Sequence, residues 1–295
     1  MRILLTGCNG QAGFELQRTL APLGELIALT RAQCDLSQPD ALRQVIRSSK
    51  PQVIVNAAAY TSVDKAQTER ELAHAVNGIA PGIIGEEAKH IGAWVVHYST
   101  DYVFDGTKAS PYTESDPPNP QGVYGASKLA GELALQHSGA SHLILRTSWV
   151  FGAHGGNFAK TILRLAGERE ELRVVADQHG APTPAALIAE VTAQLIAACA
   201  RQDLKTFPLG LYHLAAAGET TWHEYACRVV ESAYNAGKAL KLRAGHIHPI
   251  TTAEYPLPAP RPANSRLDTT KLRTTFGLTL PDWGVGLEQV IQQIV

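Results

Sequence analysis

The sequence predicts an α/β protein with a doubly wound, Rossmann-type parallel sheet and a smaller, mostly helical lobe. Short apolar strands alternate with amphipathic helices in the first half, a glycine-rich turn follows the first strand, and the alternation stops after Trp149. Continuously apolar strands are typical of a parallel sheet covered on both faces. We therefore place a dinucleotide-binding domain at 1–149 and a mainly substrate-binding lobe at 150–295, and expect later returns of the chain to the sheet.

The first half contains five expected strands and four expected helices. Each strand is a short apolar run, whereas each helix repeats its apolar residues every three or four positions. In chain order the strands lie at 3–5, 26–29, 53–56, 94–99 and 143–146, and the helices at 14–23, 40–48, 75–91 and 123–137.

The second half is dominated by helical patterns. Segment 249–262 is rich in proline and is expected to be an irregular connection, because proline lacks the backbone N–H that regular structure uses. The expected helices lie at 158–166, 187–200, 222–233 and 287–294, and short strands at 173–175 and 211–214.

Composition excludes several classes of function. The 295 residues carry a net charge of −1, and nucleic-acid-binding domains usually have a basic surplus. No apolar stretch is long enough to cross a bilayer, and the first apolar run is too short for a signal peptide. The four cysteines form no Cys-x-x-Cys pair, and the histidines form no ligand set. We expect a cytoplasmic protein with reduced thiols, no metal, and no nucleic-acid or membrane partner.

The glycine-rich turn predicts a dinucleotide site. Gly7, Gly10 and Gly13 are spaced at three residues between a strand and a helix. Glycine lets the backbone approach a pyrophosphate closely, and the N–H groups of a helix start attract its charge. Gln11 and Ala12 are then the first helical residues to face the phosphates.

The end of the second strand indicates which cofactor is bound. An NAD site usually has an acid here to bind the ribose 2′-hydroxyl. This chain has Thr30 and Arg31 instead, which favours the 2′-phosphate of NADPH while leaving NADH plausible. Asp35 and Leu36 follow and are expected to flank the adenine.

The third strand ends in small residues. Ala58 and Ala59 are followed by Tyr60 and Thr61. Small side chains at this point let a cofactor cross the edge of the sheet. All four residues are assigned to the cofactor site, although a tightly packed strand end is the alternative interpretation.

Tyr124 and Lys128 are the predicted catalytic pair. They stand four residues apart in an expected helix, so they share one face of it. Thr100 ends the preceding strand and is expected to bind the substrate oxygen, with Ser99 as its rival. A glycine-rich turn, a strand-end hydroxyl and Tyr-x-x-x-Lys occur in the chain order of a short-chain dehydrogenase/reductase. The same spacing at 234–238 has no such context and is interpreted as chance.

The pair also predicts an electrostatic effect. Tyrosine has an ordinary pKa of about 10, and a cation about 4 Å away is worth about 4 kcal/mol at an effective dielectric constant of about 20. Lys128 is therefore expected to lower the pKa of Tyr124 toward neutrality. Trp149 ends a strand beside this group, where its ring could stack on a sugar or pack in the core.

Four segments spread along the chain are distinctive. They are Leu-Thr-Gly-x-x-Gly-Gln-x-Gly at 5–13, Ser-Thr-Asp-Tyr-Val-Phe-Asp-Gly at 99–106, Val-Tyr-Gly-x-Ser-Lys-Leu-Ala-Gly-Glu at 123–132, and Arg-Pro-Ala-Asn-Ser-Arg-Leu-Asp at 261–268. With these segments the chain resembles, along nearly its whole length, the dTDP-4-dehydrorhamnose reductases, which are extended short-chain reductases. The segment at 99–106 is the most specific, because epimerase relatives usually carry Ser-Ser there.

The resemblance implies a reaction and a substrate. The 4-keto group of dTDP-4-dehydro-β-L-rhamnose would be reduced to dTDP-L-rhamnose with NADPH or NADH. Tyr124 would be the proton donor. The substrate, a nucleotide-diphosphate sugar, would be contacted by Thr100, Asp101, Tyr102 and Trp149 at the sugar, and by Asn157, Arg261 and Asn264 at the diphosphate or nucleotide.

One feature of some family members, a dimer bridged by magnesium, is only partly matched by this sequence. Some family members form dimers bridged by magnesium held by glutamates, and Glu15 and Glu288 could match two of these. The helix expected after residue 183 begins with 184–186, which lack the acid expected there. Magnesium is therefore doubtful, and both a monomer and a homodimer stay open.

Two other functions remain as alternatives. A nucleotide-sugar epimerase or dehydratase would keep its NAD, and generally binds it through the acid that is missing after the second strand. A non-catalytic, dinucleotide-binding regulatory subunit would not need the hydroxyl, Tyr124 and Lys128 that are present here. Oxidation of NADPH in proportion to added 4-keto sugar nucleotide separates the reductase from both.

Overall fold

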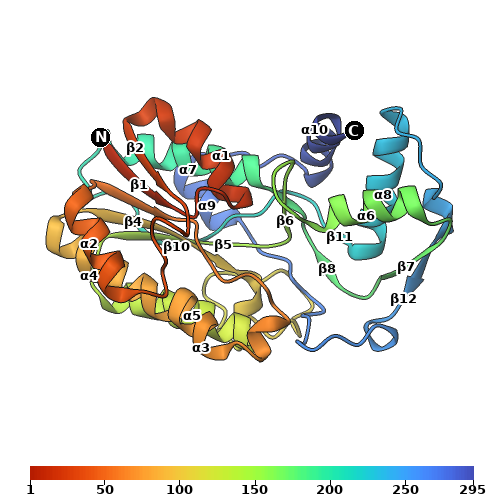
Figure 1. Cartoon of the computed structure of the whole chain (residues 1–295), viewed down its shortest axis with the longest axis horizontal. Coiled ribbons are helices and arrows are strands. Elements are labelled where there is room, and N and C mark those ends of the chain that lie inside the picture. Colours follow the sequence, from red (N-terminus) through yellow and green to blue (C-terminus); the bar gives the residue numbers. More distant parts are fainter.

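The computed structural model describes all 295 residues and shows a parallel sheet flanked by helices, with further helices beside it (Figure 1). Six strands form the sheet in the order β10-β5-β4-β3-β1-β2, and every neighbouring pair is parallel. The five strands expected in the first half are confirmed. The strands are β1 (Arg2–Thr6), β2 (Glu25–Leu29), β3 (Val53–Asn56), β4 (Trp94–Thr100), β5 (His142–Thr147) and β10 (Gly210–His213).

The winding of the sheet reverses at β1. Strand β2 lies on one side of β1 and β3 lies on the other. The carboxyl ends of the strands at such a switch point border a crevice that the connecting helices do not fill. The glycine-rich turn follows β1 and therefore opens into this crevice.

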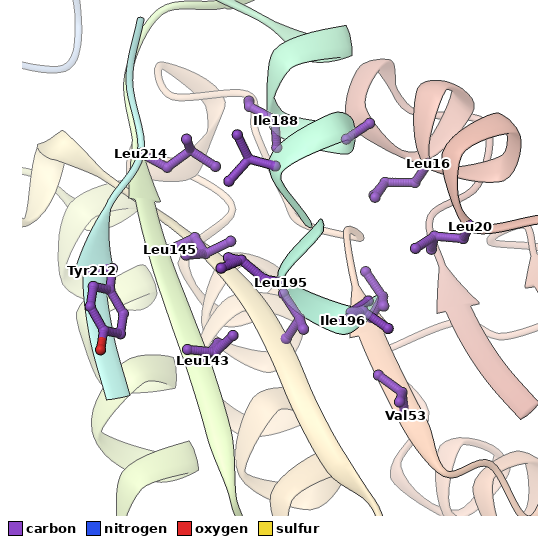
Figure 2. Packing of buried hydrophobic residues seen from close by; sticks show 14 of the residues in the cluster. Leu16, Leu20, Val53, Leu143, Leu145, Ile188, Leu195, Ile196, Tyr212 and Leu214 are labelled. Carbon is purple, nitrogen blue, oxygen red and sulfur yellow. The ribbon is translucent and has the colours of Figure 1, made fainter. Parts of the chain in front are cut away.

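Helices cover both faces of the sheet because its strands are apolar on both sides. Leu5 of β1 packs with helices α1 and α7, whereas Leu4 packs with α2, α4 and α5 on the opposite face. Figure 2 shows Leu16 of α1 and Ile188 of α7 in the first of these layers. The helices are α1 (Gln11–Leu20), α7 (Ala185–Cys199), α2 (Pro39–Ser49), α4 (Ala80–Ile91) and α5 (Val123–His137).

The single helix expected at 75–91 is wrong in its first part. The structure has α3 (Arg70–His74), then a π-helical turn η3 (Ala75–Ile79), and then α4. The turn places Asn77 so that its amide bonds both the N–H and the carbonyl of Tyr60, and also the Ser127 hydroxyl. The irregular turn thus connects the loop after β3 to α5.

The second half of the chain builds the lobe and also returns to the sheet. Strand β10 pairs with β5, and both α7 and α9 (Thr270–Phe276) pack on the sheet. The lobe has its own apolar core, formed mainly by α6 (Phe158–Glu168), α8 (Trp222–Asn235), α10 (Trp283–Ile294), β7 (Leu172–Val175) and β12 (Ile247–Ile250). Two short pairs, β6 (Val150–Phe151) with β9 (Thr183–Pro184) and β8 (His179–Gly180) with β11 (Thr220–Thr221), join it to the rest.

The prediction of an irregular segment at 249–262 is wrong at its start. Pro249 and Ile250 belong to β12, which pairs with β7 in a two-stranded sheet. Each strand of such a pair has a free edge, and proline is tolerated where its missing N–H would face away from the partner. No helix in the structure is both long and apolar enough to cross a membrane.

Candidate active site

The glycine-rich turn requires its glycines. Gly7 has a φ of +70°, and a Cβ on it would lie 2.7 Å from the backbone of Ala58. A Cβ on Gly13 would lie 2.0 Å from the carbonyl oxygen of Gly7. Gly10 precedes α1 and supplies no capping side chain. The first turn of α1 therefore presents its N–H groups to the crevice, as a pyrophosphate site requires.

A cavity of about 640 Å³ runs from this turn to the end of β4. Nearly all the residues predicted to bind the cofactor line it. The exceptions are Gly13, which packs beneath the turn, and Thr30, which lines an adjoining depression with Arg31 and Asp35. The predicted residues in the wall of the cavity are Gly7, Gly10, Gln11, Ala12, Arg31, Asp35, Leu36, Ala58, Ala59, Tyr60, Thr61, Tyr124 and Lys128.

Two hydroxyl groups in this cavity have no partner in the protein. Ser99 Oγ and Thr147 Oγ1 are buried, line the cavity wall and form no hydrogen bond. Buried polar atoms rarely stay without a partner, so these two suit a polar ligand such as a nicotinamide cofactor. Thr147 was not among the residues predicted from the sequence. Its position at the end of β5, beside the end of β4, is the signal that could have identified it.

Tyr124 lines the cavity, whereas Thr100, its hydrogen-bond partner, lies outside the cavity wall. Tyr124 stands in the first turn of α5, and its ring packs edge-on against Tyr102 with 5.5 Å between centroids. Burial raises the pKa of Tyr124 to about 12, the Asp101 carboxylate adds to the rise, and a hydrogen bond with Thr100 opposes it. The Tyr124 hydroxyl therefore stays protonated at neutral pH and can act as a proton donor.

The prediction that Lys128 lowers the pKa of Tyr124 is wrong for this structure. Lys128 Nζ donates to the carbonyl oxygen of Tyr98 at 2.6 Å and lies 3.5 Å from His97 Nε2. Burial outweighs every other influence on both groups, and it lowers the pKa of Lys128 itself to about 8. The simple charge-pair argument failed because it ignored how deeply α5 places the pair.

Trp149 has an unusual backbone. Its φ is +47°, a left-handed conformation that is strained for a bulky residue. Its ring stacks on Trp222 with 3.6 Å between centroids, and a Cβ on Gly180 would come within 2.6 Å of the same ring. Trp149 is thus clamped between the lobe and the end of β5, where backbone strain is typical of functional positions.

A second cavity, of about 910 Å³, lies mainly in the lobe, and its wall combines apolar side chains with both basic and acidic ones. Tyr102 and Arg261 are the predicted substrate residues that line it. The Arg261 guanidinium is bonded to Asp64 at 2.7 Å. Sequence reasoning missed several other residues in the wall, because they come together only when the lobe folds: Phe158, Arg169, Arg173, Trp222 and Tyr255.

The remaining predicted substrate residues lie outside the walls of both cavities. Asn157 caps α6 and donates to Gln11 Oε1 at 3.0 Å, which connects the lobe to the glycine-rich turn. The Asn264 amide donates to the carbonyls of Lys108 and Ser110. These contacts favour positioning roles for both asparagines. Asp101 is buried and bonded to Thr100, and burial raises its pKa to about 6.

The second Tyr-x-x-x-Lys pair lies on the surface. Tyr234 is 50% exposed at the end of α8, and the Arg243 guanidinium covers its ring. Lys238 Nζ lies at hydrogen-bond distance from the carbonyl of Ile294. Neither residue lines a described cavity, in agreement with the interpretation of this pair as chance.

Comparison with known proteins identifies the family. A family model described as the RmlD substrate binding domain matches residues 1–295. The dTDP-4-dehydrorhamnose reductase of Burkholderia thailandensis is 50% identical over 290 residues, covering 97% of each protein. The chain belongs to the dTDP-4-dehydrorhamnose reductase family. The dTDP-4-dehydrorhamnose reductase of Bacillus anthracis, solved in complex with NADP, is similar at a TM-score of 0.88 and 35% identity over 98% of each chain.

Within this reductase family, the two glutamates considered for a bridging magnesium each pair with an arginine in this chain. Arg18 of α1 lies 3.6 Å from Glu15 and also 3.6 Å from Glu190 of α7. Glu288 is instead bonded to Arg228 of α8. No group of three or more His, Cys, Asp or Glu residues could hold a metal. Residues 184–186, at the start of α7, include no acid, but Glu190 lies further along the same helix.

Proposed function

We infer that this protein reduces the 4-keto group of dTDP-4-dehydro-β-L-rhamnose to dTDP-L-rhamnose, using NADPH. The observation that carries the proposal is the ring pair Tyr102–Tyr124, which joins the two cavities. Tyr124 lines the cavity after the glycine-rich turn, and Tyr102 lines the cavity of the lobe. A sugar nucleotide held in the lobe can thus place its keto group beside Tyr124.

The reaction needs one hydride and one proton. Bound NADPH would supply the hydride, and the residues that would hold it are the glycine-rich turn, Arg31 and the residues after β3. Thr100 or Ser99 would bind the keto oxygen, and Tyr124 would transfer its hydroxyl proton to that oxygen as it becomes an alkoxide. An alkoxide is a stronger base than a phenolate, so this transfer is favourable even with the raised pKa of Tyr124. Trp149 and Trp222 would form an apolar wall against the sugar.

A turnover assay tests the proposal directly. NADPH mixed with the protein and dTDP-4-dehydro-β-L-rhamnose should be oxidised one for one with the sugar consumed. Retention of NAD by the purified protein, with no net oxidation, would point to the epimerase or dehydratase. Complete absence of turnover would favour the regulatory subunit. The same assay with UDP-linked sugars measures how strongly the lobe selects the nucleotide.

Arg31→Ala should weaken NADPH more than NADH. The Arg31 side chain is 70% exposed at the depression next to the cavity, and its partner Asp35 is 3.4 Å away. An exposed charge-assisted hydrogen bond to a 2′-phosphate is worth about 1.4 kcal/mol, so KM for NADPH should rise about tenfold. KM for NADH should change less than about twofold, because NADH has no 2′-phosphate.

Arg164→Ala is the matched control for this variant. Arg164 also forms an exposed pair with an acid four residues away, and it lines neither cavity. Its substitution should leave both cofactor KM values unchanged. Equal increases for NADPH and NADH in Arg31→Ala would remove Arg31 from the 2′-phosphate site.

A further inference from the structure

A row of buried polar side chains crosses the sheet behind the active site. Thr6 and Asn56 are the last residues of β1 and β3, and His97 lies in the middle of the adjacent strand β4. The strand register places Thr6 beside Asn56 and Asn56 beside His97. Each of the three residues is 1% exposed. None of them lines the cofactor cavity or the lobe cavity. Polar groups in such a sheet interior are costly, so their hydrogen bonds need an explanation.

The hydrogen bonds of this row have one direction. Thr6 Oγ1 donates to Asn56 Oδ1 at 2.7 Å, which leaves the Asn56 amide nitrogen to face His97 Nδ1 at 3.1 Å. An amide nitrogen is a donor, so His97 Nδ1 must be the acceptor. A neutral imidazole with an acceptor at Nδ1 carries its proton on Nε2. Burial and the nearby Lys128 hold the pKa of His97 well below its ordinary value, so the ring is neutral.

The row ends on the lysine of the active site. His97 Nε2 lies 3.5 Å from Lys128 Nζ, and Lys128 in turn donates to the Tyr98 carbonyl. An ammonium group has only donors, whereas a neutral amine has a lone pair that can accept from Nε2–H. The Nε2–H group of His97 can therefore donate to Lys128 when Lys128 is a neutral amine, whereas it would face another donor if Lys128 were an ammonium group.

We propose that Thr6, Asn56 and His97 are positioning residues whose hydrogen bonds hold Lys128 in place and stabilise its neutral form. The inference rests on the proposed reductase activity and concerns the proton that follows the hydride. Tyr124 gives its proton to the substrate oxygen and becomes a phenolate. No direct hydrogen bond joins Lys128 to Tyr124, but both line the cofactor cavity, so a proton from Lys128 then reaches that phenolate through a hydroxyl group or water in the cavity. Lys128 becomes the neutral amine, which accepts from His97, and solvent later returns a proton to it.

Other groups around Lys128 set the background against which the row acts. The pKa of Lys128 is lowered to about 8 by burial, and Glu132 on the same helix opposes this. Because Glu132 is paired with Arg146, its effect on Lys128 is partly offset. The charged or titratable groups that act on His97 are Lys128 and His142 of β5, and the group that acts on Lys128 is Glu132 of α5, itself paired with Arg146 of β5. Tyr124 shares the cofactor cavity with Lys128, and Asp101 after β4 acts on Tyr124.

Nuclear magnetic resonance tests the direction of the row without any turnover. Long-range proton–nitrogen correlation spectra of the ¹⁵N-labelled protein distinguish the two neutral histidine tautomers, and His97→Gln assigns the His97 signals. We expect Nδ1 without a proton and Nε2 with one throughout the neutral pH range. A proton on Nδ1, or on both nitrogens, would overturn the inference while leaving the reductase activity untouched.

Asn56→Asp tests the consequence for the reaction. A carboxylate only accepts hydrogen bonds, so it should move the ring proton to Nδ1 and leave Nε2 as an acceptor for the ammonium. The rate should fall with rising pH as Lys128 loses its charge. In the variant this alkaline limb should move up by at least about one pH unit. At neutral pH kcat should fall at least about fivefold with KM for the sugar unchanged, because only proton transfer is affected.

The double variant Asn56→Asp/His97→Leu separates the row from a simple charge effect. It keeps the new carboxylate but interrupts the hydrogen bonds at His97. The alkaline limb should return most of the way to its original pH if the row acts through His97. An equal shift in the single and double variants would show that the carboxylate acts on Lys128 through space, which would contradict the proposal. An unshifted alkaline limb in Asn56→Asp would also contradict it, provided that the variant keeps the original thermal unfolding temperature.

Discussion

Tyr124→Phe should lower kcat by a factor of about 10² or more, because it removes the proton donor and changes little else. The Tyr124 ring packs against Tyr102, and phenylalanine keeps that edge-on contact. Cofactor affinity should stay within about twofold, since the glycine-rich turn and Arg31 are unchanged. Stopped-flow measurement of NADPH oxidation, with cofactor binding followed separately by fluorescence, gives both quantities.

Tyr102→Phe is the matched control for this variant. Tyr102 lies beside Tyr124, and burial likewise raises the pKa of its hydroxyl. It lines the lobe cavity rather than the cofactor cavity, so its loss should affect KM for the sugar more than kcat. If Tyr124→Phe kept most of its turnover while Tyr102→Phe lost it, the proton donor would have to be reassigned to Tyr102.

The sheet domain was predictable because its signals are local. The strand at 53–56 and the helix at 123–137 have the bounds that their apolar patterns indicate. The glycine-rich turn and the Tyr124–Lys128 pair are defined by short spacings, and the fold brings both to one cavity. Periodicity and turn chemistry contain this information without any knowledge of distant contacts.

The lobe and the electrostatics were less predictable because they depend on contacts between distant residues. The pairing of Pro249 with Val174 creates β12, and no local pattern marks it. Trp222 lines the lobe cavity and stacks on Trp149, a residue far from it in the sequence. The contact between His97 and Lys128 depends on how α5 lies over β4, so their spacing in the chain did not reveal it.

The salt bridge Glu132–Arg146 should be the most important ion pair for stability, because it is almost fully buried. Two hydrogen bonds of 2.9 and 2.6 Å join the groups, and their side chains are 1% and 3% exposed. The Arg146 guanidinium also lies 5.0 Å from the centroid of the Phe104 ring. Glu132→Leu would leave a buried, uncompensated cation, which should lower the free energy of unfolding by about 3–5 kcal/mol.

A double variant decides whether this cost arises from the unpaired charge. Glu132→Leu/Arg146→Met removes both charges and should recover most of the lost stability in urea unfolding, because a buried pair replaced by apolar groups is often nearly neutral. Glu168→Leu, which breaks the exposed pair with Arg164, should cost less than about 1 kcal/mol. A double variant no more stable than Glu132→Leu would show that packing, rather than the unpaired Arg146 charge, causes the loss.

The double variant should also change the pH dependence of the rate. Glu132 raises the pKa of Lys128, so without it the loss of activity with rising pH should begin at a lower pH than in the original protein, even where stability is recovered.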